Sequence, residues 1–276
     1  MAVHPTAIIA PQAQIDPSAE IGPYCLIDPH VKIGPRTRLG PHCHLTGWTT
    51  IGADNRIHAG VIIGEAPQDL SYQGDRSYVV IGDRNTIREY ATIHRGTPAE
   101  SRTEIGDDCF IMGAAHLAHN VRLGNKVTLA NAVLLAGFVE IDDGAFFSGS
   151  AMAHQFVRIG RLAMLRGAAL ATMDVPPFMT CVYACEISNI NLVGLRRAGF
   201  TKEQIAEVKQ AYRILYRSNK PFRQSIEQIR QMVRTEPGRQ LVEFLTNPSR
   251  RGIAGRPRRK LSRTTAPPED HDADMP

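Results

Sequence analysis

Aliphatic residues recur at every sixth position near the start of the chain. The register begins at Ile9 and continues as Ile15, Ile21, Ile27, Ile33, Leu39, Leu45, Ile51, Ile57 and Ile63. The fifth residue of most hexads is small or β-branched: Ala13, Ala19, Cys25, Val31, Thr37, Cys43 and Thr49. No helix has a period of six, and a plain amphipathic strand has a period of two. The pattern therefore predicts short strands joined by regular turns, with one aliphatic side chain per strand pointing to a shared axis.

The hexad register is interrupted twice and then continues. It resumes at Ile81, Ile87 and Ile93, and later runs from Ile105 to Ala171. The interruptions are residues 65–80 and 98–104. Insertions in a solenoid emerge as loops on one face, often the binding face, although tolerated surface loops are an equally good interpretation. We expect a mainly β fold over residues 1–187, a parallel β-helix of hexapeptide repeats with three hexads in each triangular coil.

Helical patterns replace the hexads from about Ser188. Thr201 and Gln204 have the spacing of a capping box, and apolar residues follow at helical intervals: Ile205, Val208, Ala211, Tyr212 and Leu215. Pro221 and Pro237 suit the starts of a second and a third helix. Residues 188–247 are therefore expected to form a C-terminal α-helical domain that covers one end of the solenoid. Residues 248–276 lack apolar periodicity, so we expect a disordered tail.

Positive charge is concentrated in the helical segment. The whole chain of 276 residues has a net charge of +5, whereas residues 196–240 hold eleven Lys or Arg against four Glu, a net +7. No aromatic-interleaved basic patch or recognition motif supports nucleic-acid binding. A docking face for an acidic protein partner and a solvated helical surface both explain this charge.

The chain shows no pattern of export, of a membrane span or of a metal site. No stretch approaches the eighteen or so apolar residues of a transmembrane helix, and the N-terminus lacks the basic and apolar regions of a secretory signal. We therefore expect a cytoplasmic protein. Cys25, Cys43 and Cys109 occupy small-residue positions of the repeat and are expected in the core. Cys181 and Cys185 have no second Cys or His pair near them in sequence with which to bind zinc.

Histidines mark the candidate chemistry. Because Leu117 fills an inward position, His116 and His119 beside it are expected to project outward. One coil spans about eighteen residues, which places Gly137 next to His119 and His154 in the coil beyond. An isolated surface histidine rarely has a function, but three close together on a regular repeat indicate a site. Since the apolar axis leaves no internal cavity, this site is expected on the surface, in a cleft between subunits.

An ordered series of motifs resembles one family of acyltransferases. The motifs are Ile63–Leu70, Ile81–Glu89, Thr92–Thr97, His116–His119, His154–Phe156, Asp174–Phe178 and Gly194–Phe200. Together they resemble the UDP-N-acetylglucosamine O-acyltransferases that begin lipid A synthesis, over about residues 3–245. The resemblance implies a left-handed β-helix, a homotrimer, and a 3-hydroxyacyl donor held as the phosphopantetheine thioester of acyl carrier protein. It also implies transfer to the 3-hydroxyl of UDP-N-acetylglucosamine, with no metal and no other cofactor.

The same resemblance implies a role for each matching residue. It makes His119 the general base that deprotonates the acceptor hydroxyl, a role that suits imidazole at neutral pH. It makes the backbone N–H of Gly137 the donor to the oxyanion, and it puts Gly167 at the floor of the acyl groove. The residues implied to contact the sugar nucleotide are Asp69, His116, His154, Gln155, Asn191 and Arg197.

The chain departs from the family pattern at five positions around these residues. The departures are Ser71 in place of Lys, Phe138 in place of His, Asn120 in place of the usual Asp, Val193 in place of Glu and Ala198 in place of a second Arg. The loss of a charged contact can change the preferred acceptor. Two alternatives therefore stay open: a related transferase that uses acyl carrier protein with a different sugar nucleotide, hydroxyl or amine acceptor, and a non-catalytic β-helix that binds a partner.

Overall fold

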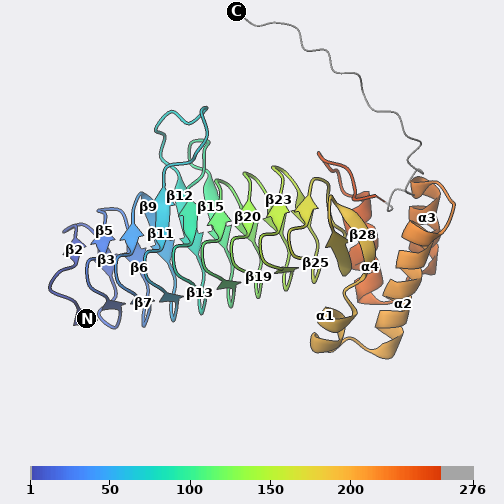
Figure 1. The fold of residues 1–276 in the computed structure, drawn as a ribbon, viewed down its shortest axis with the longest axis horizontal. Helices are drawn as coiled ribbons and strands as arrows, with labels where there is room; N and C mark the ends of the chain where they lie inside the picture. The colour runs from blue at the N-terminus through green and yellow to red at the C-terminus, as the bar shows by residue number, and fades with distance from the viewer. Residues whose placement is uncertain (1, 256–276) are drawn as a thin grey trace, which may run out of the picture.

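The computed structural model describes residues 2–255, which form a left-handed parallel β-helix followed by helices (Figure 1). Sheet A consists of β1 (Ala2–Val3), β4 (Glu20–Ile21), β7 (Arg38–Leu39), β10 (Arg56–Ile57), β13 (Thr86–Ile87), β16 (Phe110–Ile111), β19 (Thr128–Leu129), β22 (Phe146–Phe147), β25 (Met164–Leu165), β27 (Met179–Val182) and β28 (Glu186–Ile190). Sheet B consists of β2 (Ile8–Ile9), β5 (Leu26–Ile27), β8 (His44–Leu45), β11 (Ile62–Glu65), β14 (Thr92–His94), β17 (His116–Leu117), β20 (Leu134–Leu135), β23 (Met152–Ala153) and β26 (Leu170–Ala171). Sheet C consists of β3 (Gln14–Ile15), β6 (Lys32–Ile33), β9 (Trp48–Ile51), β12 (Tyr78–Ile81), β15 (Arg102–Ile105), β18 (Arg122–Leu123), β21 (Glu140–Ile141) and β24 (Arg158–Ile159).

The hexad decides which residue of each strand turns inward. In β17, Leu117 is fully buried while His116 is half-buried. Leu117 lies in register with Ile93 of one neighbouring coil and Leu135 of the other, so the aliphatic side chains stack along the axis. Each such side chain contributes about 1.5–3 kcal/mol through burial. The predicted hexapeptide β-helix is therefore confirmed, and the three cysteines expected in its core (Cys25, Cys43 and Cys109) are buried.

The turns between sheets share one backbone geometry, and they are named here by the sheets they connect. At the B–C corner, the fourth residue of the hexad has a positive φ at Asn120 (60°) and Phe138 (59°). The same holds at the C–A corner for Arg84 (57°) and Asp108 (58°). A left-handed residue reverses the chain within one turn and directs its side chain away from the axis. The fourth residue at these corners therefore points away from the axis, and Asn120 does so while being buried.

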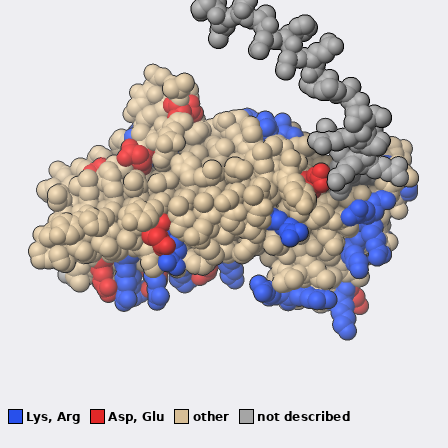
Figure 2. Space-filling model, viewed as in Figure 1, with Lys and Arg blue, Asp and Glu red and all other residues tan. Residues whose placement is uncertain are grey.

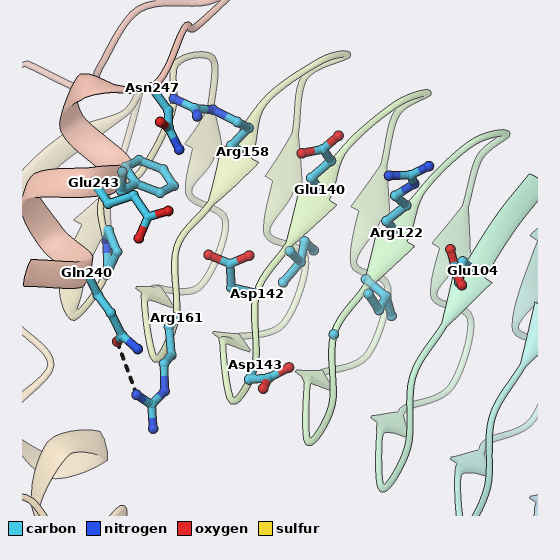
Figure 3. A pocket seen from close by; sticks show the side chains of 15 residues that line it. Glu104, Arg122, Glu140, Asp142, Asp143, Arg158, Arg161, Gln240, Glu243 and Asn247 are labelled. Carbon is cyan, nitrogen blue, oxygen red and sulfur yellow. Dashed lines mark hydrogen bonds between the residues drawn. The ribbon is translucent and has the colours of Figure 1, made fainter. Parts of the chain in front are cut away.

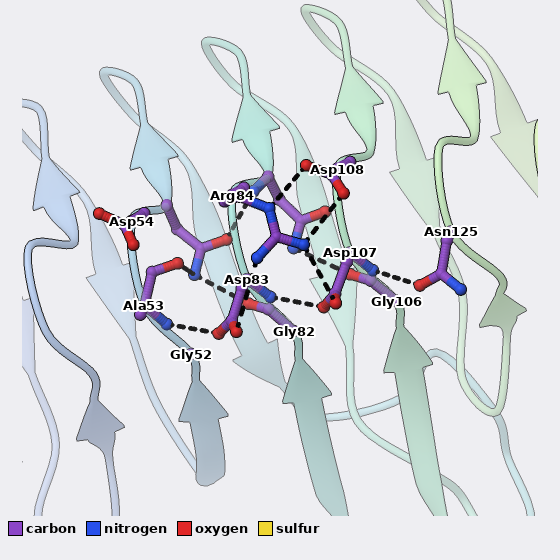
Figure 4. A network of polar contacts seen from close by, with 12 residues as sticks. Gly52, Ala53, Asp54, Gly82, Asp83, Arg84, Gly106, Asp107, Asp108 and Asn125 are labelled. Atoms are coloured by element: carbon purple, nitrogen blue, oxygen red, sulfur yellow. Dashed lines mark hydrogen bonds and ion pairs between the residues drawn. The ribbon is translucent and has the colours of Figure 1, made fainter.

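A ladder of polar side chains follows the C–A corner (Figure 4). Asp83 Oδ1 accepts the backbone N–H of Ala53 at 2.7 Å, and Asp107 Oδ1 accepts that of Asp83 at 2.8 Å. The side chain of Asn125 accepts the N–H of Asp107 at 2.8 Å. In these coils the third residue of the hexad thereby satisfies a turn N–H that has no backbone acceptor, as buried or half-buried polar groups require.

Two loops leave the solenoid at the B–C corner and project away from the coils (Figure 1). Residues 66–77 connect β11 with β12, and residues 95–101 connect β14 with β15. β12 begins at Tyr78 and β15 at Arg102, inside the two ranges expected to be insertions, and they pair in parallel with each other. Both loops lie at the corner that carries His119.

The helical end begins after an antiparallel hairpin of β27 and β28. Its helices are α1 (Leu192–Arg197), α2 (Lys202–Tyr212) with a π-helical continuation over Arg213–Arg217, α3 (Phe222–Met232) and α4 (Glu236–Thr246). The predicted capping box between Thr201 and Gln204 is confirmed at the start of α2. α3 begins directly after Pro221, and Pro237 lies in the first turn of α4. The sequence pattern does not predict α1, because six residues are too few to show an apolar period. No helix within residues 2–255 is long and apolar enough to cross a membrane.

Residues 250–255 pack against the end of the β-helix, which corrects the expectation of a disordered tail starting at residue 248. Ile253 forms a parallel bridge with Asp174, and Ala254 is fully buried. The hydroxyl of Tyr216 donates a hydrogen bond to the carbonyl of Ala254 at 3.1 Å. So short an extended segment shows no periodicity, and only its docking on the last coil reveals it. The rest of the expected tail, residues 256–276, lies outside the described residues.

Candidate active site

The orientation of the His119 ring is fixed by its neighbour Asn120. The backbone N–H of Thr97 donates to Asn120 Oδ1 at 2.9 Å, so this atom is the amide oxygen. The same oxygen lies 3.1 Å from His119 Nδ1. An amide oxygen only accepts, so a hydrogen bond between them requires the proton on Nδ1. The neutral ring therefore presents Nε2 as an unprotonated nitrogen that can accept a proton.

Asp69 reaches the other nitrogen of His119 from the first loop. Its Oδ2 lies 3.5 Å from His119 Nε2. The backbone N–H and the hydroxyl of Ser71 donate to Asp69 Oδ1 at 2.9 and 2.8 Å, and these bonds hold the pKa of the Asp69 carboxyl below its usual range. The carboxylate is thus charged beside Nε2. Ser71 replaces the cation of the resembled family with a side chain that fixes this carboxylate.

The side chain of Arg95 ties the first loop to the coil beneath it. Arg95 Nη2 donates to the hydroxyl of Tyr72 at 3.0 Å, and its guanidinium lies 5.4 Å from the centre of the Tyr72 ring. Arg95 Nη1 donates to the carbonyl of Gly64 at 2.7 Å. The position of Asp69 therefore depends on Arg95, the first residue of the second loop, and on its contacts with the first loop.

Gly137 lies directly against the His119 ring. A Cβ atom at position 137 would come within 2.4 Å of His119 Cε1 and 2.5 Å of Nε2. Within residues 2–255, the N–H of Gly137 makes no backbone or side-chain hydrogen bond. Phe138 packs edge-on against His119 with ring centres 5.3 Å apart. His119 projects from the coil as predicted, yet only 7% of it is exposed because these neighbours cover it.

His116 belongs to a second pair of rings on the same side of the coil. Its Nδ1 lies 2.7 Å from Thr92 Oγ1, and its ring meets that of His94 edge-on at 4.8 Å. Burial lowers the pKa of His116, and burial together with the neighbouring His116 lowers the pKa of His94 to about 4. His94 Nδ1 is buried without a hydrogen-bond partner among the described residues. The sequence reasoning included His94 in a motif but did not single it out.

His154 and Gln155 lie one coil beyond Gly137 at the same corner. The N–H of Phe156 donates to the Gly137 carbonyl at 3.1 Å, which sets the stacking of the two turns. His154 is exposed, and Gln155 is half-exposed. The structure therefore brings together most of the predicted residues at one corner: Asp69, His116, His119, Gly137, His154 and Gln155.

Three predicted residues lie elsewhere in the chain. Asn191 donates to the carbonyl of Leu162 at the C–A corner, and its oxygen caps α1 by accepting the N–H of Gly194. Arg197, at the end of α1, lines a groove at the same corner. Gly167 lies in the turn from sheet A to sheet B, the third corner of the triangle. One copy of the chain does not unite these residues with His119.

Two adjoining grooves follow the outer face of sheet C. The larger, about 620 Å³, separates sheet C from α4; Figure 3 shows its lining residues, among them Glu104, Arg122, Glu140, Arg158, Gln240 and Glu243. The smaller, about 450 Å³, shares Arg122 and Glu140 with it and extends to Asn120 and Phe138. Neither groove is lined by a residue predicted to bind or react. The smaller groove does open beside the corner that holds His119.

The fold and the corner site together define a hexapeptide-repeat protein of the transferase type. Residues 30–65 match the family model described as bacterial transferase hexapeptide (six repeats). Residues 174–254 match the model described as UDP-N-acetylglucosamine O-acyltransferase, domain 2. The two matches cover a stretch of the solenoid and the helical end.

Relatives narrow this class to one family. The chain is 51% identical over 231 residues to an acyl-[acyl-carrier-protein]–UDP-N-acetylglucosamine O-acyltransferase of Anaeromyxobacter sp. (strain Fw109-5), covering 83% of this chain and 90% of the relative. It is 46% identical over 258 residues to that of Burkholderia orbicola (strain MC0-3), covering 91% and 98%. The structure of Francisella novicida UDP-N-acetylglucosamine acyltransferase superposes with a TM-score of 0.89 at 38% identity, over 93% of this chain and 95% of that one. The chain belongs to the UDP-N-acetylglucosamine O-acyltransferase family.

Proposed function

We propose that the protein transfers a 3-hydroxyacyl chain from acyl carrier protein to the 3-hydroxyl of UDP-N-acetylglucosamine, the first step of lipid A synthesis. Membership of the family supports this reaction. The observation that carries it is the environment of His119, in which Asn120 holds the Nδ1 proton and leaves Nε2 open between Asp69 and Gly137. A base, a charged partner and a free N–H donor are the groups that acyl transfer to an alcohol requires.

The reaction uses these groups in two steps. His119 Nε2 takes the proton of the sugar 3-hydroxyl as its oxygen attacks the thioester carbonyl, and the carbonyl oxygen becomes an oxyanion. The C–S bond then breaks, and the imidazolium returns the proton to the departing phosphopantetheine sulfur. No metal or other cofactor takes part, and the thioester is the donor substrate.

The neighbours of His119 stabilise the charges that develop. The carboxylate of Asp69, 3.5 Å from Nε2, faces the imidazolium that forms when His119 takes a proton. The unbonded N–H of Gly137 is available to the oxyanion, and an N–H aimed at developing charge typically contributes about 10²–10³-fold in rate. His116, His154 and Gln155 project from the same corner and contact the sugar nucleotide.

We propose a homotrimer because a single copy leaves the site incomplete and one sheet uncovered. The outward residues of sheet B are mostly apolar, in contrast to the polar and charged outward residues of sheet C. Three of them are strongly exposed: Ile8 (69%), Leu26 (40%) and Leu134 (46%). A neighbouring copy that covers sheet B would bring its own Asn191, Arg197 and Gly167 towards the His119 corner of the first. The number three follows from the resemblance, and light scattering that gives a monomer would contradict it.

The helical end is the proposed docking face for acyl carrier protein. Figure 2 shows Lys and Arg side chains gathered over this end of the molecule. The exposed side chains of Arg197, Lys202, Lys209 and Arg213 contribute to its positive charge. A positive face steers an acidic partner and weakens with salt. Since acyl carrier protein supplies the donor, we place the reaction in the cytoplasm.

The test is an assay of acyl carrier protein thioesters against a panel of UDP-sugars, with products identified by mass spectrometry. We expect acylated UDP-N-acetylglucosamine as the main product. Phe138 presents a phenyl ring where the resembled family carries an imidazole, so an amino-sugar nucleotide is the competing acceptor in the panel. Preferential acylation of that sugar would redirect the proposal to a different acceptor, and no product with any sugar would leave the non-catalytic alternative.

A further inference from the structure

Arg250 lies at the end of a row of side chains in contact that begins at His119, the proposed general base. The ring of Phe138 stacks on that of Phe156 with centres 5.1 Å apart and planes 23° apart. The guanidinium carbon of Arg250 lies 4.7 Å from the centre of the Phe156 ring. With the edge contact between Phe138 and His119, one row runs along the B–C corner from His119 to Arg250.

The residues that follow Arg250 are held against the β-helix, whereas the charge of the Arg250 guanidinium is not paired within residues 2–255. Arg251 donates to the carbonyl of Thr172 at 3.2 Å, and Ile253 bridges Asp174, so the segment is anchored on both counts. The Arg250 side chain is exposed, and within residues 2–255 it makes no ion pair or hydrogen bond. Its five N–H donors are therefore available in a planar arrangement, and the contact with Phe156 limits how that plane can turn.

We propose that Arg250, seated on Phe156, forms a phosphate-binding subsite next to the catalytic corner. This inference rests on the proposed function, because both substrates of that reaction carry phosphate: the phosphopantetheine arm of the donor and the diphosphate of the acceptor. A guanidinium binds phosphate through two parallel N–H···O bonds, which a Lys ammonium cannot reproduce. The aromatic seat reduces the side-chain entropy lost when the phosphate binds.

The experiment compares the wild type with Arg250→Gln and Arg250→Lys. Binding of 4′-phosphopantetheine and of UDP is measured by calorimetry, and KM is measured for acyl carrier protein thioester and for UDP-N-acetylglucosamine. We expect Arg250→Gln to weaken one probe and raise the matching KM by about tenfold, with Arg250→Lys in between. Weaker phosphopantetheine binding assigns the donor phosphate, and weaker UDP binding assigns the acceptor. Arg56→Gln, an exposed arginine of β10 on sheet A, is the control and should change neither.

Unchanged affinity for both probes together with unchanged KM for both substrates would overturn the subsite. This outcome is distinct from failure of the proposed function. If the wild type acylates UDP-N-acetylglucosamine and Arg250→Gln behaves identically, only the subsite is wrong. If the wild type forms no product but Arg250→Gln still loses affinity for a phosphate probe, the subsite stands and the reaction is wrong.

Discussion

The B–C and C–A corners are built from the same hexad and the same left-handed turn, yet they use their polar groups differently. In three successive coils of the C–A corner the third hexad residue is Asp83, Asp107 and Asn125, and each side chain accepts a turn N–H of the preceding coil. At the B–C corner the corresponding residues are His119 and Gly137. There the N–H of Gly137 has no acceptor within residues 2–255.

The fourth residues of the two corners differ in the same way. At the C–A corner Arg84 forms hydrogen bonds with Asp108 at 2.8 and 3.0 Å, so both charges are paired. At the B–C corner Asn120 holds the His119 ring and Phe138 packs against it. At the C–A corner the polar side chains are paired with the backbone and with one another. At the B–C corner a base and an N–H donor remain available. The candidate site therefore lies at the corner where the polar groups of the repeat are not all paired with one another.

The largest expected effect tests the base. His119→Ala should lower kcat/KM for acyl transfer by roughly 10²–10⁴-fold, because it removes the imidazole nitrogen that is placed to take the acceptor proton. The thermal transition and the oligomeric state should stay as in the wild type. Full activity of this variant would show that His119 is not the base and that the B–C corner is not the catalytic site.

Gly137→Ala should reduce kcat/KM by about 10²-fold, since the added Cβ meets the His119 ring and displaces Nε2. Gly149→Ala is the matched control, because its added Cβ would have only the carbonyl of Asn131, at 3.6 Å, as a neighbour. Steady-state kinetics of both variants measures the difference. Equal activity of the two would show that the packing against His119 has no catalytic consequence.

Acid should destabilise the protein through His94. Its folded pKa of about 4 lies below the ordinary value of 6.5, so only the unfolded chain binds a proton between these values. Stability is therefore lost as pH falls from about 6.5 to 4, by about 3 kcal/mol in total. Denaturant unfolding of wild type and His94→Gln at pH 7 and pH 4.5 measures this loss. The variant should lose less stability on acidification, and an equal loss would assign it to other groups.

Asn120→Asp should move the acid limb of the kcat/KM profile to higher pH by roughly one unit, because a carboxylate beside Nδ1 stabilises the imidazolium. Asn125→Asp makes the same change in the C–A ladder and should leave the profile unmoved. Kinetics from pH 5 to pH 9 compares the two variants. A shift in both, or in neither, would contradict the separation of the corners.

The smallest effect belongs to the ladder itself. Asp107→Ala removes the acceptor of the Asp83 N–H and should lower the free energy of unfolding by about 1 kcal/mol with kcat/KM unchanged. Asp107→Asn keeps an acceptor oxygen and should recover most of this loss. Chemical denaturation and steady-state kinetics on the same samples provide the measurement. A loss of activity in Asp107→Ala at full stability would show that the ladder itself takes part in catalysis.

Several parts of the molecule follow from local pattern alone. The period of six predicts the coils, because only one side chain in each strand meets the axis, and Thr201 with Gln204 predicts the start of α2. The stacking of His119, Gly137 and Gln155 also follows, since residues about eighteen apart meet in neighbouring coils. Residues 250–255 and α1 do not follow, because each is too short to show a period.

The sequence by itself determined the solenoid, its interruptions and which histidines point outward, because these features depend only on the six-residue period. The tertiary structure decided what those histidines can do. Asp69 comes from a loop, Thr97 from a second loop and Arg250 from the end of the described chain, and no spacing rule places them at one corner. The tautomer of His119 depends on Thr97 through Asn120, a contact between segments 23 residues apart. Proton transfer requires atoms placed within hydrogen-bond distance, and that distance is set by packing between coils and loops rather than by the repeat.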